Sequence, residues 1–503
     1  MRHRLSAIYI ALLLSVFLLA FSPGGYGTIP EVKYRLFLFI CGGYVFLTAF
    51  LRIWLALTGA EPIGKLEDLP LAVKCLLGFL FFTIASSLFS EFPGTFLGRF
   101  RQEGVLTIGL YVLSCVCLSQ YFQPRKWMLF LLGIGAAFTS VLSLIQLTGA
   151  NPFTLYPEGL NYYGAGTYYS GEFLGTIGNA GLLAGFLVLA AGVLAMAMIK
   201  FEFKTRWLLS LPFFLVVLLI FEMGIYAGLV ALAVGMVFLL PAAVTSQKTL
   251  ANTLLILAIT LAAFALSRIL IFQDGPILFA PIPLPLVAAV GLVALFVVFV
   301  LKGPLFVDIP IRRYRIGALF VIFGGICFAL LYLLLYSGES AGMLYEASQV
   351  LRGNWDDTFG TRRVYIWRHV LAGIRWETLL LGTGPDTLGY WPIPHFSRYI
   401  EELGITVTSG IDAAHNEYLH ILATGGLLSL LAYLGALVIA AVHWFRNPDN
   451  ALSAVAGAGV LFYLIQAFFG ISQFLAAPFF WACLGVLLYA QSNKNTTGPQ
   501  FAL

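Results

Sequence analysis

Apolar segments long enough to cross a lipid bilayer recur along the whole chain, and this feature limits its possible folds more than any other. A helix of about 20 apolar residues spans the hydrocarbon core of a bilayer and satisfies its own backbone hydrogen bonds there. The chain is 60% hydrophobic and 10% charged, whereas soluble domains are roughly a quarter charged. The sequence therefore predicts an all-α, polytopic membrane protein and excludes a soluble domain.

The hydropathy pattern predicts 14 membrane-spanning helices, or 12 to 13 if neighbouring segments merge. The first apolar run follows Arg2 and Arg4 but lacks a convincing cleavage site, so it is interpreted as a retained helix and not as a signal peptide. The expected spans are residues 5–21, 35–57, 71–90, 104–121, 127–147, 179–199, 207–222, 224–242, 250–271, 284–301, 316–336, 417–442, 451–470 and 472–490.

Lysine and arginine are distributed unevenly between the two sets of short loops, and such residues favour the cytoplasmic side of a membrane. With a cytoplasmic N-terminus, fifteen of them fall in inner loops and five in short outer loops. Both termini are therefore expected in the cytoplasm. The expected parts are about 11 helices in residues 1–336, an extracytoplasmic loop at 337–412, about three helices in 413–490 and a cytoplasmic tail at 491–503. The net charge of +5 follows mostly from this orientation and does not indicate nucleic-acid binding.

The longest polar interruption of the chain runs into the charge-free segment 421–442. Asp412 is expected to cap a helix that begins at Ala413, which places His415 in the first turn at the membrane surface. The positive end of a helix disfavours an imidazolium, so His415 is expected to be a neutral base near pH 7. A histidine beside a membrane also fits a purely structural role, and these residues alone leave both roles open.

Within the long loop, a second pattern predicts an amphipathic helix that lies on the membrane. Its apolar residues recur at helical spacing and are Val364, Trp367, Leu371 and Ile374. Thr361 is a suitable N-cap, which puts Arg362 beside unpaired backbone N–H groups that attract phosphate.

Metal binding receives little support from the sequence. Asp356 and Asp357 are adjacent, but paired carboxylates more often hydrate a loop than bind a divalent cation. The six cysteines all fall in apolar segments and indicate neither a disulfide framework nor a metal cluster. Two outer stretches are also polar: the loop with Arg99 and Arg101, and a tyrosine-rich segment at 148–178.

Several short stretches resemble the family of O-antigen ligases and O-antigen polymerases, which are bacterial membrane glycosyltransferases. The matching stretches are residues 360–363 with Trp367, 380–385, 415–419 followed by Gly425-Gly426, and the earlier stretches 101–104 and 175–179. Their order, spacing and position on one predicted membrane face make the resemblance specific over about residues 95–445.

The resemblance implies an activity at the outer face of the inner (plasma) membrane. Members of this family transfer a glycan from a polyprenyl diphosphate carrier to a hydroxyl of a lipid, a glycan or a protein, during biosynthesis of cell-surface polysaccharide. It implies that Arg362 holds the diphosphate and that His415 acts at the reaction centre. The further substrate-binding positions that it implies are Arg363, Arg101, Arg99, Asn416 and Asn179.

Neither a metal nor another cofactor is expected, because diphosphate is a good leaving group that a cation can stabilise. One departure concerns the donor site. Many members carry Ser-Arg in a mid-chain helix, whereas residues 223–228 here contain no cation. A second donor contact is therefore expected from Arg101, Arg99 or Arg268.

The alternative function is that of a flippase for lipid-linked oligosaccharides or of another polysaccharide transporter. A flippase places its functional charges in a membrane cavity and keeps its loops short. This chain instead gathers His, Arg and Asp in one long outer loop. The sequence leaves open the acceptor, the sugars, the oligomeric state, and the choice between ligase and polymerase.

Overall fold

A computed structural model describes residues 1–60, 66–164, 171–201, 204–281, 287, 290–291, 293–294, 311–338, 341–400 and 405–492. Within these residues the regular secondary structure is helical apart from two short antiparallel hairpins. Eight helices are long and apolar enough to cross a membrane, and four shorter apolar helices accompany them in the described part. The predicted all-α, polytopic architecture is therefore confirmed. The span expected at 284–301 lies largely outside the described residues.

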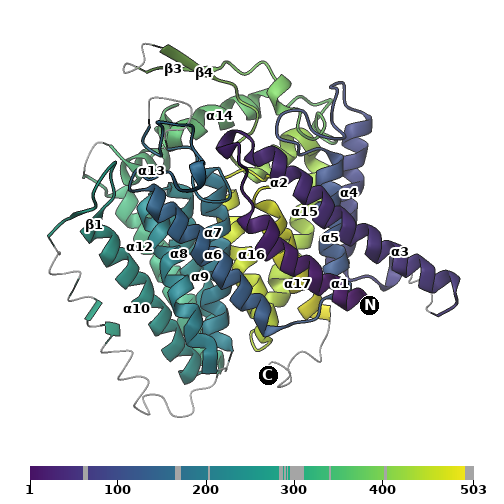
Figure 1. Cartoon of the computed structure of the whole chain (residues 1–503), viewed down its shortest axis with the longest axis horizontal. Coiled ribbons are helices and arrows are strands. Elements are labelled where there is room, and N and C mark those ends of the chain that lie inside the picture. The colour runs from purple at the N-terminus through teal and green to yellow at the C-terminus, as the bar shows by residue number, and fades with distance from the viewer. Residues whose placement is uncertain are drawn as a thin grey trace.

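The helices of the first half lie on both sides of the bundle in Figure 1, with α3, α4 and α5 at the right and α8, α9 and α10 at the left. Their bounds are α1 Arg2–Leu12, α2 Ile29–Phe37, α3 Gly43–Leu57, α4 Leu71–Leu88, α5 Val105–Tyr121, α6 Lys126–Gln146, α7 Ala180–Lys200, α8 Ser210–Met223, α9 Tyr226–Ala243 and α10 Gln247–Ile269. Short π-helical segments, η1 Leu13–Phe17 and η3 Leu38–Gly42, continue α1 and join α2 to α3.

The second half supplies α13, α14 and the longer hairpin, and four further apolar helices. Its elements are α12 Ile311–Leu334, α13 Met343–Leu351, α14 Phe359–Gly373, α15 Glu417–Arg446, α16 Ala451–Ala467 and α17 Ala477–Ser492. The hairpins are β1 Leu270–Ile271 with β2 Leu278–Phe279, and β3 Phe396–Ile400 with β4 Ile405–Ser409.

The helix α7 forms the centre of the bundle. It is apolar on every face, as expected for a helix surrounded by protein, and its membrane-length window is entirely buried. It packs against α16, α8 and α9. Beside this core, α4 packs on α15 and α5 packs on α17, and these four helices carry the candidate site at their ends.

Two details differ from the sequence interpretation. The second span begins at Ile29 and not at residue 35, because α2, η3 and α3 form one continuous helix. Lys33, expected in an outer loop, is buried in this helix, and its Nζ donates hydrogen bonds to the carbonyl groups of Phe17 at 2.8 Å and Leu18 at 3.2 Å. The ammonium group thereby satisfies carbonyl groups at the end of the first helix.

The two faces of the bundle can be told apart. The helix α14 and the β3–β4 hairpin lie together at one end (Figure 1). The N-terminus lies at the other end, where Arg2 Nη1 donates a hydrogen bond to Tyr121 Oη at 2.9 Å at the close of α5. Which of these faces is cytoplasmic stays a prediction.

Candidate functional site

Three segments that are distant in sequence meet at the α14 end of the bundle. They are the loop 98–104 before α5, the turn 381–386 and the residues 410–416 before α15. Asp386 joins the first two, because its Oδ2 accepts hydrogen bonds from the backbone N–H groups of Phe100 at 2.8 Å and Arg101 at 2.9 Å. Arg101 joins the first and the third, because its Nη2 donates to Asp412 Oδ1 at 2.6 Å. The three segments are thus one polar unit.

His415 lies in this unit, directly before the cap of α15. Its backbone is left-handed, with φ of 49°, a conformation that costs a non-glycine residue of the order of 1–3 kcal/mol and that clusters at functional sites. The next residue, Asn416, is the cap, since its Oδ1 accepts a hydrogen bond from the N–H of Leu419 at 2.9 Å. The side chain of His415 therefore projects from a fixed turn and not from a helical turn.

The predicted start of this helix is wrong. Asp412 does not cap a helix at Ala413, because Arg101 occupies its carboxylate and α15 begins only at Glu417. Asn416 is an equally good N-cap residue. His415 consequently precedes the helix and does not belong to its first turn.

The imidazole of His415 is half-buried and has arginine charges nearby. Burial lowers the pKa of His415 to about 3, and the positive charges of Arg101 and Arg363 act in the same direction, whereas Asp412 opposes them. The imidazole is neutral at physiological pH, as expected. The main causes of the lowered pKa are burial and two guanidinium groups. From the sequence, the neutral state was instead expected to come from the positive end of a helix.

The start of α14 is an unusual left-handed turn. Gly360, Thr361 and Arg362 have φ of 62°, 54° and 66°, so the right-handed helix begins after Arg362. Thr361 was predicted to be the N-cap of this helix, but it does not act as one, because a cap residue needs an extended backbone. Its hydroxyl instead donates a hydrogen bond to the carbonyl of Gly360 at 2.6 Å and accepts one from Arg363 Nη1 at 2.6 Å.

The two arginines of this turn have different environments. Arg363 is partly buried, and its guanidinium also donates to the carbonyl groups of Phe469 at 3.0 Å and Gly360 at 2.8 Å. Arg362 is exposed. Arg363 therefore supplies a fixed positive charge near His415, whereas Arg362 faces the solvent. Donor binding by either residue stays a prediction.

The helix predicted from residue 361 onward is present as α14, but it packs on protein more than expected. Its buried residues are Val364, Ile366 and Val370, whereas Leu371 of the expected apolar stripe is 56% exposed. Trp367 Nε1 donates a hydrogen bond to the carbonyl of Ala414 at 3.0 Å. The helix thus contacts the residue next to His415.

The glycine motifs have a structural explanation. The helix α15 is interrupted at Gly426, where φ is 81° and ψ is 174°, and the turn that contains Gly382 fills the break. The N–H of Gly384 donates to the carbonyl of Thr424 at 2.8 Å, and the N–H of Leu427 donates to the carbonyl of Leu379 at 2.8 Å. The Leu380–Pro385 stretch therefore completes a broken helix beside the site.

The remaining predicted substrate-binding residues are more peripheral. Arg99 is exposed in the loop 98–104. Asn179 is the N-cap of α7, and its Oδ1 accepts a hydrogen bond from the N–H of Leu182 at 3.0 Å. Like Asn416, it already uses its side-chain oxygen to cap a helix. The structure thus brings Arg101, Arg363 and His415 together, and a binding role for the two asparagines stays a prediction.

Four buried or half-buried titratable residues near the site were missed in the sequence: Glu103, Asp386, Glu417 and His420. They line a cavity of about 60 Å³ at the ends of α4, α5 and α15. Burial raises the pKa of the Glu103 and Asp386 carboxyl groups. Asp386 Oδ1 and His420 Nδ1 find no hydrogen-bond partner among the described residues. Ionisable residues beside membrane spans are rare and usually functional, and Glu103 and Glu417 also lie in the family-like stretches 101–104 and 415–419.

The adjacent carboxylates of the long loop are engaged locally. Asp356 Oδ1 accepts hydrogen bonds from the N–H of Thr358 at 2.8 Å and from its hydroxyl at 2.6 Å. Asp357 forms an ion pair with Arg368 at 3.0 Å. In the described part of the chain, no group of three or more His, Cys, Asp or Glu residues is arranged to hold a metal ion.

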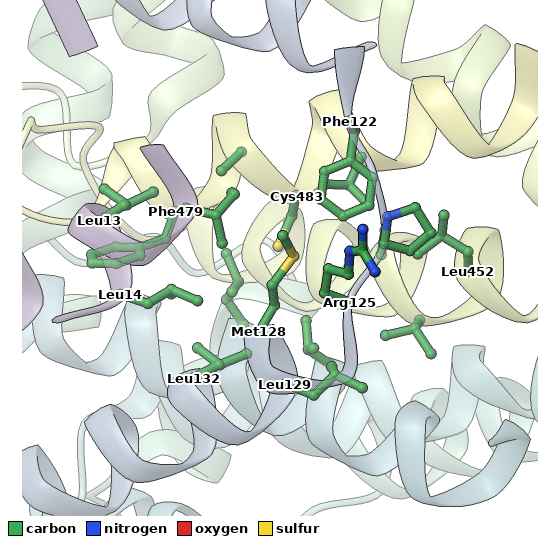
Figure 2. Close-up of a pocket in the computed structure, with 18 of the residues that line it drawn as sticks. Leu13, Leu14, Phe122, Arg125, Met128, Leu129, Leu132, Leu452, Phe479 and Cys483 are labelled. Atoms are coloured by element: carbon green, nitrogen blue, oxygen red, sulfur yellow. The ribbon is translucent and has the colours of Figure 1, made fainter. Parts of the chain in front are cut away.

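A second pocket lies away from this polar unit. Figure 2 shows Leu13, Leu14, Met128 and Leu132 around an apolar cavity of about 110 Å³, with Arg125 at its edge. Arg125 follows α5 and so lies at the end of the bundle opposite His415. The pocket shares no lining residue with the cavity beside the site, and its lining is almost entirely apolar.

Comparison with known proteins bears on this arrangement. Residues 284–434 match the family model described as O-antigen ligase. The matched region contains α14, the glycine turn and His415, and it excludes the loop with Arg101. No curated protein matches the chain.

Proposed function

Because residues 284–434 identify this chain as a member of the O-antigen ligase family, we propose that it is a membrane glycosyltransferase of cell-surface polysaccharide biosynthesis. Its donor is a glycan on a polyprenyl diphosphate carrier, and its acceptor is a hydroxyl of a lipid, a glycan or a protein. The reaction takes place at the membrane face where α14 and the β3–β4 hairpin lie. By the positive-inside asymmetry, this is the outer face of the inner membrane, with both termini cytoplasmic.

The observation that carries this proposal is the neutral imidazole of His415 beside two guanidinium groups. A base must be unprotonated to accept a proton, and the lowered pKa of His415 provides that state. A diphosphate needs positive charge, and Arg101 and Arg363 provide it close to the same imidazole. Such an arrangement suits transfer from a phosphorylated donor to a hydroxyl.

In the proposed reaction, the acceptor oxygen attacks the anomeric carbon of the donor glycan. The bond between that carbon and the diphosphate oxygen breaks, and its electron pair stays with the leaving diphosphate. His415 accepts the proton of the acceptor hydroxyl as the new glycosidic bond forms. The leaving diphosphate already carries its negative charge well, so it needs cations more than a general acid.

Arginine side chains are proposed to hold the donor. Arg362 is exposed at the start of α14, and a guanidinium can bind two phosphate oxygens at once. Arg101 is proposed as the second contact, in place of the mid-chain cation found in many family members. Its Nε is buried without a hydrogen-bond partner in the described part of the chain. With these cations in place, we propose that transfer needs no metal. Arg99, Asn416 and Asn179 are proposed as further contacts of the donor or the acceptor.

The test distinguishes the transferase from the flippase alternative. In a strain without this gene, the lipid-linked precursor should accumulate at the outer face of the inner membrane, and one surface polymer should be lost. Purified protein should then join the precursor glycan to an acceptor in detergent or nanodiscs. Accumulation at the inner face, with no transfer by the purified protein, would instead identify a flippase.

A further inference from the structure

Glu417, the first residue of α15, is a buried acidic residue to which the proposed reaction gives no task. Its side chain is 4% exposed. Both carboxylate oxygens accept hydrogen bonds from phenols: Oε1 from Tyr433 at 2.8 Å and Oε2 from Tyr463 at 3.2 Å. An ionisable side chain at such a depth is expensive to bury and usually has a function.

The two phenols belong to different segments. Tyr433 lies on α15 beyond the break at Gly426, and Tyr463 lies on α16. Glu417 lies before the break. A single carboxylate therefore connects the short first part of α15 to the long second part and to the neighbouring helix α16.

This connection is important because the break removes the usual restraint. An unbroken helix would hold its first turn through its own hydrogen bonds, but around Gly426 the backbone of α15 pairs with residues 379–384 instead. The first part, residues 417–425, is consequently connected to the second part through this turn and through side-chain contacts. His415 and its left-handed turn are attached directly to this part.

The surroundings of Glu417 agree with a positioning role more than with direct chemistry. The carboxylate lines the small cavity that Glu103, Asp386 and His420 also line. This cavity has polar groups on a largely apolar wall and is large enough for water, but its volume of about 60 Å³ is small for a sugar or a diphosphate. Glu417 therefore lines a cavity that is small for a substrate, which favours a positioning role.

We propose that Glu417 is a positioning residue for His415: held by Tyr433 and Tyr463, its carboxylate fixes the first part of α15 and thereby aims the imidazole at the acceptor. The inference rests on the proposed function. A shift of a catalytic group by about 1 Å can lower a rate on the order of 10²-fold. Loss of the tether should therefore reduce turnover and leave the donor contacts of Arg362 and Arg101 in place.

The test removes the two phenol hydroxyls together, in Tyr433→Phe/Tyr463→Phe, and measures donor affinity, kcat and KM on purified, folded protein. We expect kcat to fall roughly 10- to 100-fold, with donor affinity changed less than about twofold. Tyr44→Phe is the control. It deletes a buried hydroxyl that bonds Ser6 at 2.9 Å, far from α15 in sequence and contacts, and it should keep wild-type kcat.

Glu417→Gln removes the negative charge of the carboxylate but can keep the hydrogen bonds to the two phenols. The amide can accept a hydrogen bond from one phenol and donate one to the other, so this variant should retain most of kcat. Wild-type kcat in the double phenylalanine variant would overturn the inference. A loss of donor affinity in proportion to the loss of kcat would also overturn the inference, because that result indicates general disruption of the site.

A readout without donor keeps this inference separate from the proposed function. The rate at which diethyl pyrocarbonate modifies His415, followed by mass spectrometry, should change severalfold in the double phenylalanine variant and not in Tyr44→Phe. If the wild type failed to transfer glycan but this change were seen, the proposed function would be refuted and the positioning role retained. An unchanged modification rate would refute the positioning role.

Discussion

At the scale of single residues, the environment of His415 predicts how the stability of the folded protein depends on pH. The pKa of its imidazole is lowered from 6.5 to about 3 by burial and by two guanidinium groups. A free histidine gains a proton as the pH falls through about 6.5, whereas His415 in the folded protein does not. The stability that the neutral imidazole contributes is therefore present above about pH 6.5 and is lost as the pH falls towards 3.

The same shift predicts the pH profile of transfer. The profile of kcat/KM reports the free enzyme, so the acid limb of an ordinary histidine near pH 6.5 should be absent, and kcat/KM should stay flat from about pH 7.5 down to about pH 5. The measurement is transfer by purified protein at saturating acceptor and limiting donor. An acid limb with a midpoint near 6.5 would show that His415 titrates normally or is not the base.

Arg362 should act on donor binding. Arg362→Lys keeps the positive charge but loses the planar fork, so donor affinity should weaken by about 1–3 kcal/mol, as for a lost charge-assisted hydrogen bond. The measurement is binding of the lipid-linked donor to the purified variant. Arg368→Lys is a matched control, because Arg368 lies on the same helix and pairs with Asp357. Unchanged donor affinity in Arg362→Lys would remove Arg362 from the donor site.

At the scale of elements, the break in α15 predicts which glycines are essential. A Cβ at Gly426 would collide with the carbonyl oxygen of Leu380, and φ of 81° disfavours any side chain there. Gly426→Ala should therefore destabilise the protein by about 2 kcal/mol or more. Gly435→Ala, on the same helix, is the control, because its nearest neighbour would be Cys75 Sγ at 3.6 Å.

Thermal unfolding of the two purified variants checks this prediction. Gly426→Ala should unfold at a clearly lower temperature than the wild type, and Gly435→Ala close to the wild-type temperature. Equal behaviour of the two alanine variants would mean that the break in α15 and its pairing with the Gly382 turn are not required.

The sequence predicts the presence of most helices more accurately than the residues at which they begin. Apolar length alone locates most spans, because burial in lipid fixes the composition of a helix. The start of α15 was missed because Asp412 and Asn416 are both good caps, and only the ion pair with Arg101, about 300 residues away in the chain, decides between them. The left-handed turn before α14 was missed for a similar reason, since Thr361 and Arg362 carry no local signal for it.

The site was predictable to a similar extent. The resemblance pointed to His415, Arg363 and Arg101, which the fold brings together. It did not point to Asp386, whose carboxylate binds two backbone N–H groups of another loop. Long-range contacts of this kind depend on the packing of α4, α5 and α15 and leave no periodic pattern in the chain.

At the scale of the whole molecule, orientation in the membrane is the first prediction. Ser397 on the exposed β3–β4 hairpin should lie outside the cytoplasm, and Asn447 at the opposite end of α15 inside it. In a Cys327→Ser background, Ser397→Cys should react with an impermeant thiol reagent in intact cells, and Asn447→Cys only after lysis. The reverse pattern would invert the predicted topology.

Metal independence is a second prediction for the whole enzyme. Arginine side chains near His415 can neutralise a diphosphate, so transfer by the purified protein should persist in excess chelator. A loss of activity that magnesium or manganese restores would bring Asp356 and Asp357 forward as ligands, and Asp356→Asn should then mimic the effect of the chelator.

The central claim is that His415 is the base of a glycosyl transfer whose donor is held by other residues. The most direct test measures donor affinity and transfer rate on the same preparation of His415→Ala. Removal of a general base should lower turnover on the order of 10²–10⁴-fold and leave donor affinity nearly unchanged. Transfer near the wild-type rate, or a loss explained by donor affinity alone, would contradict the account and reassign His415 to phosphate binding or to structure.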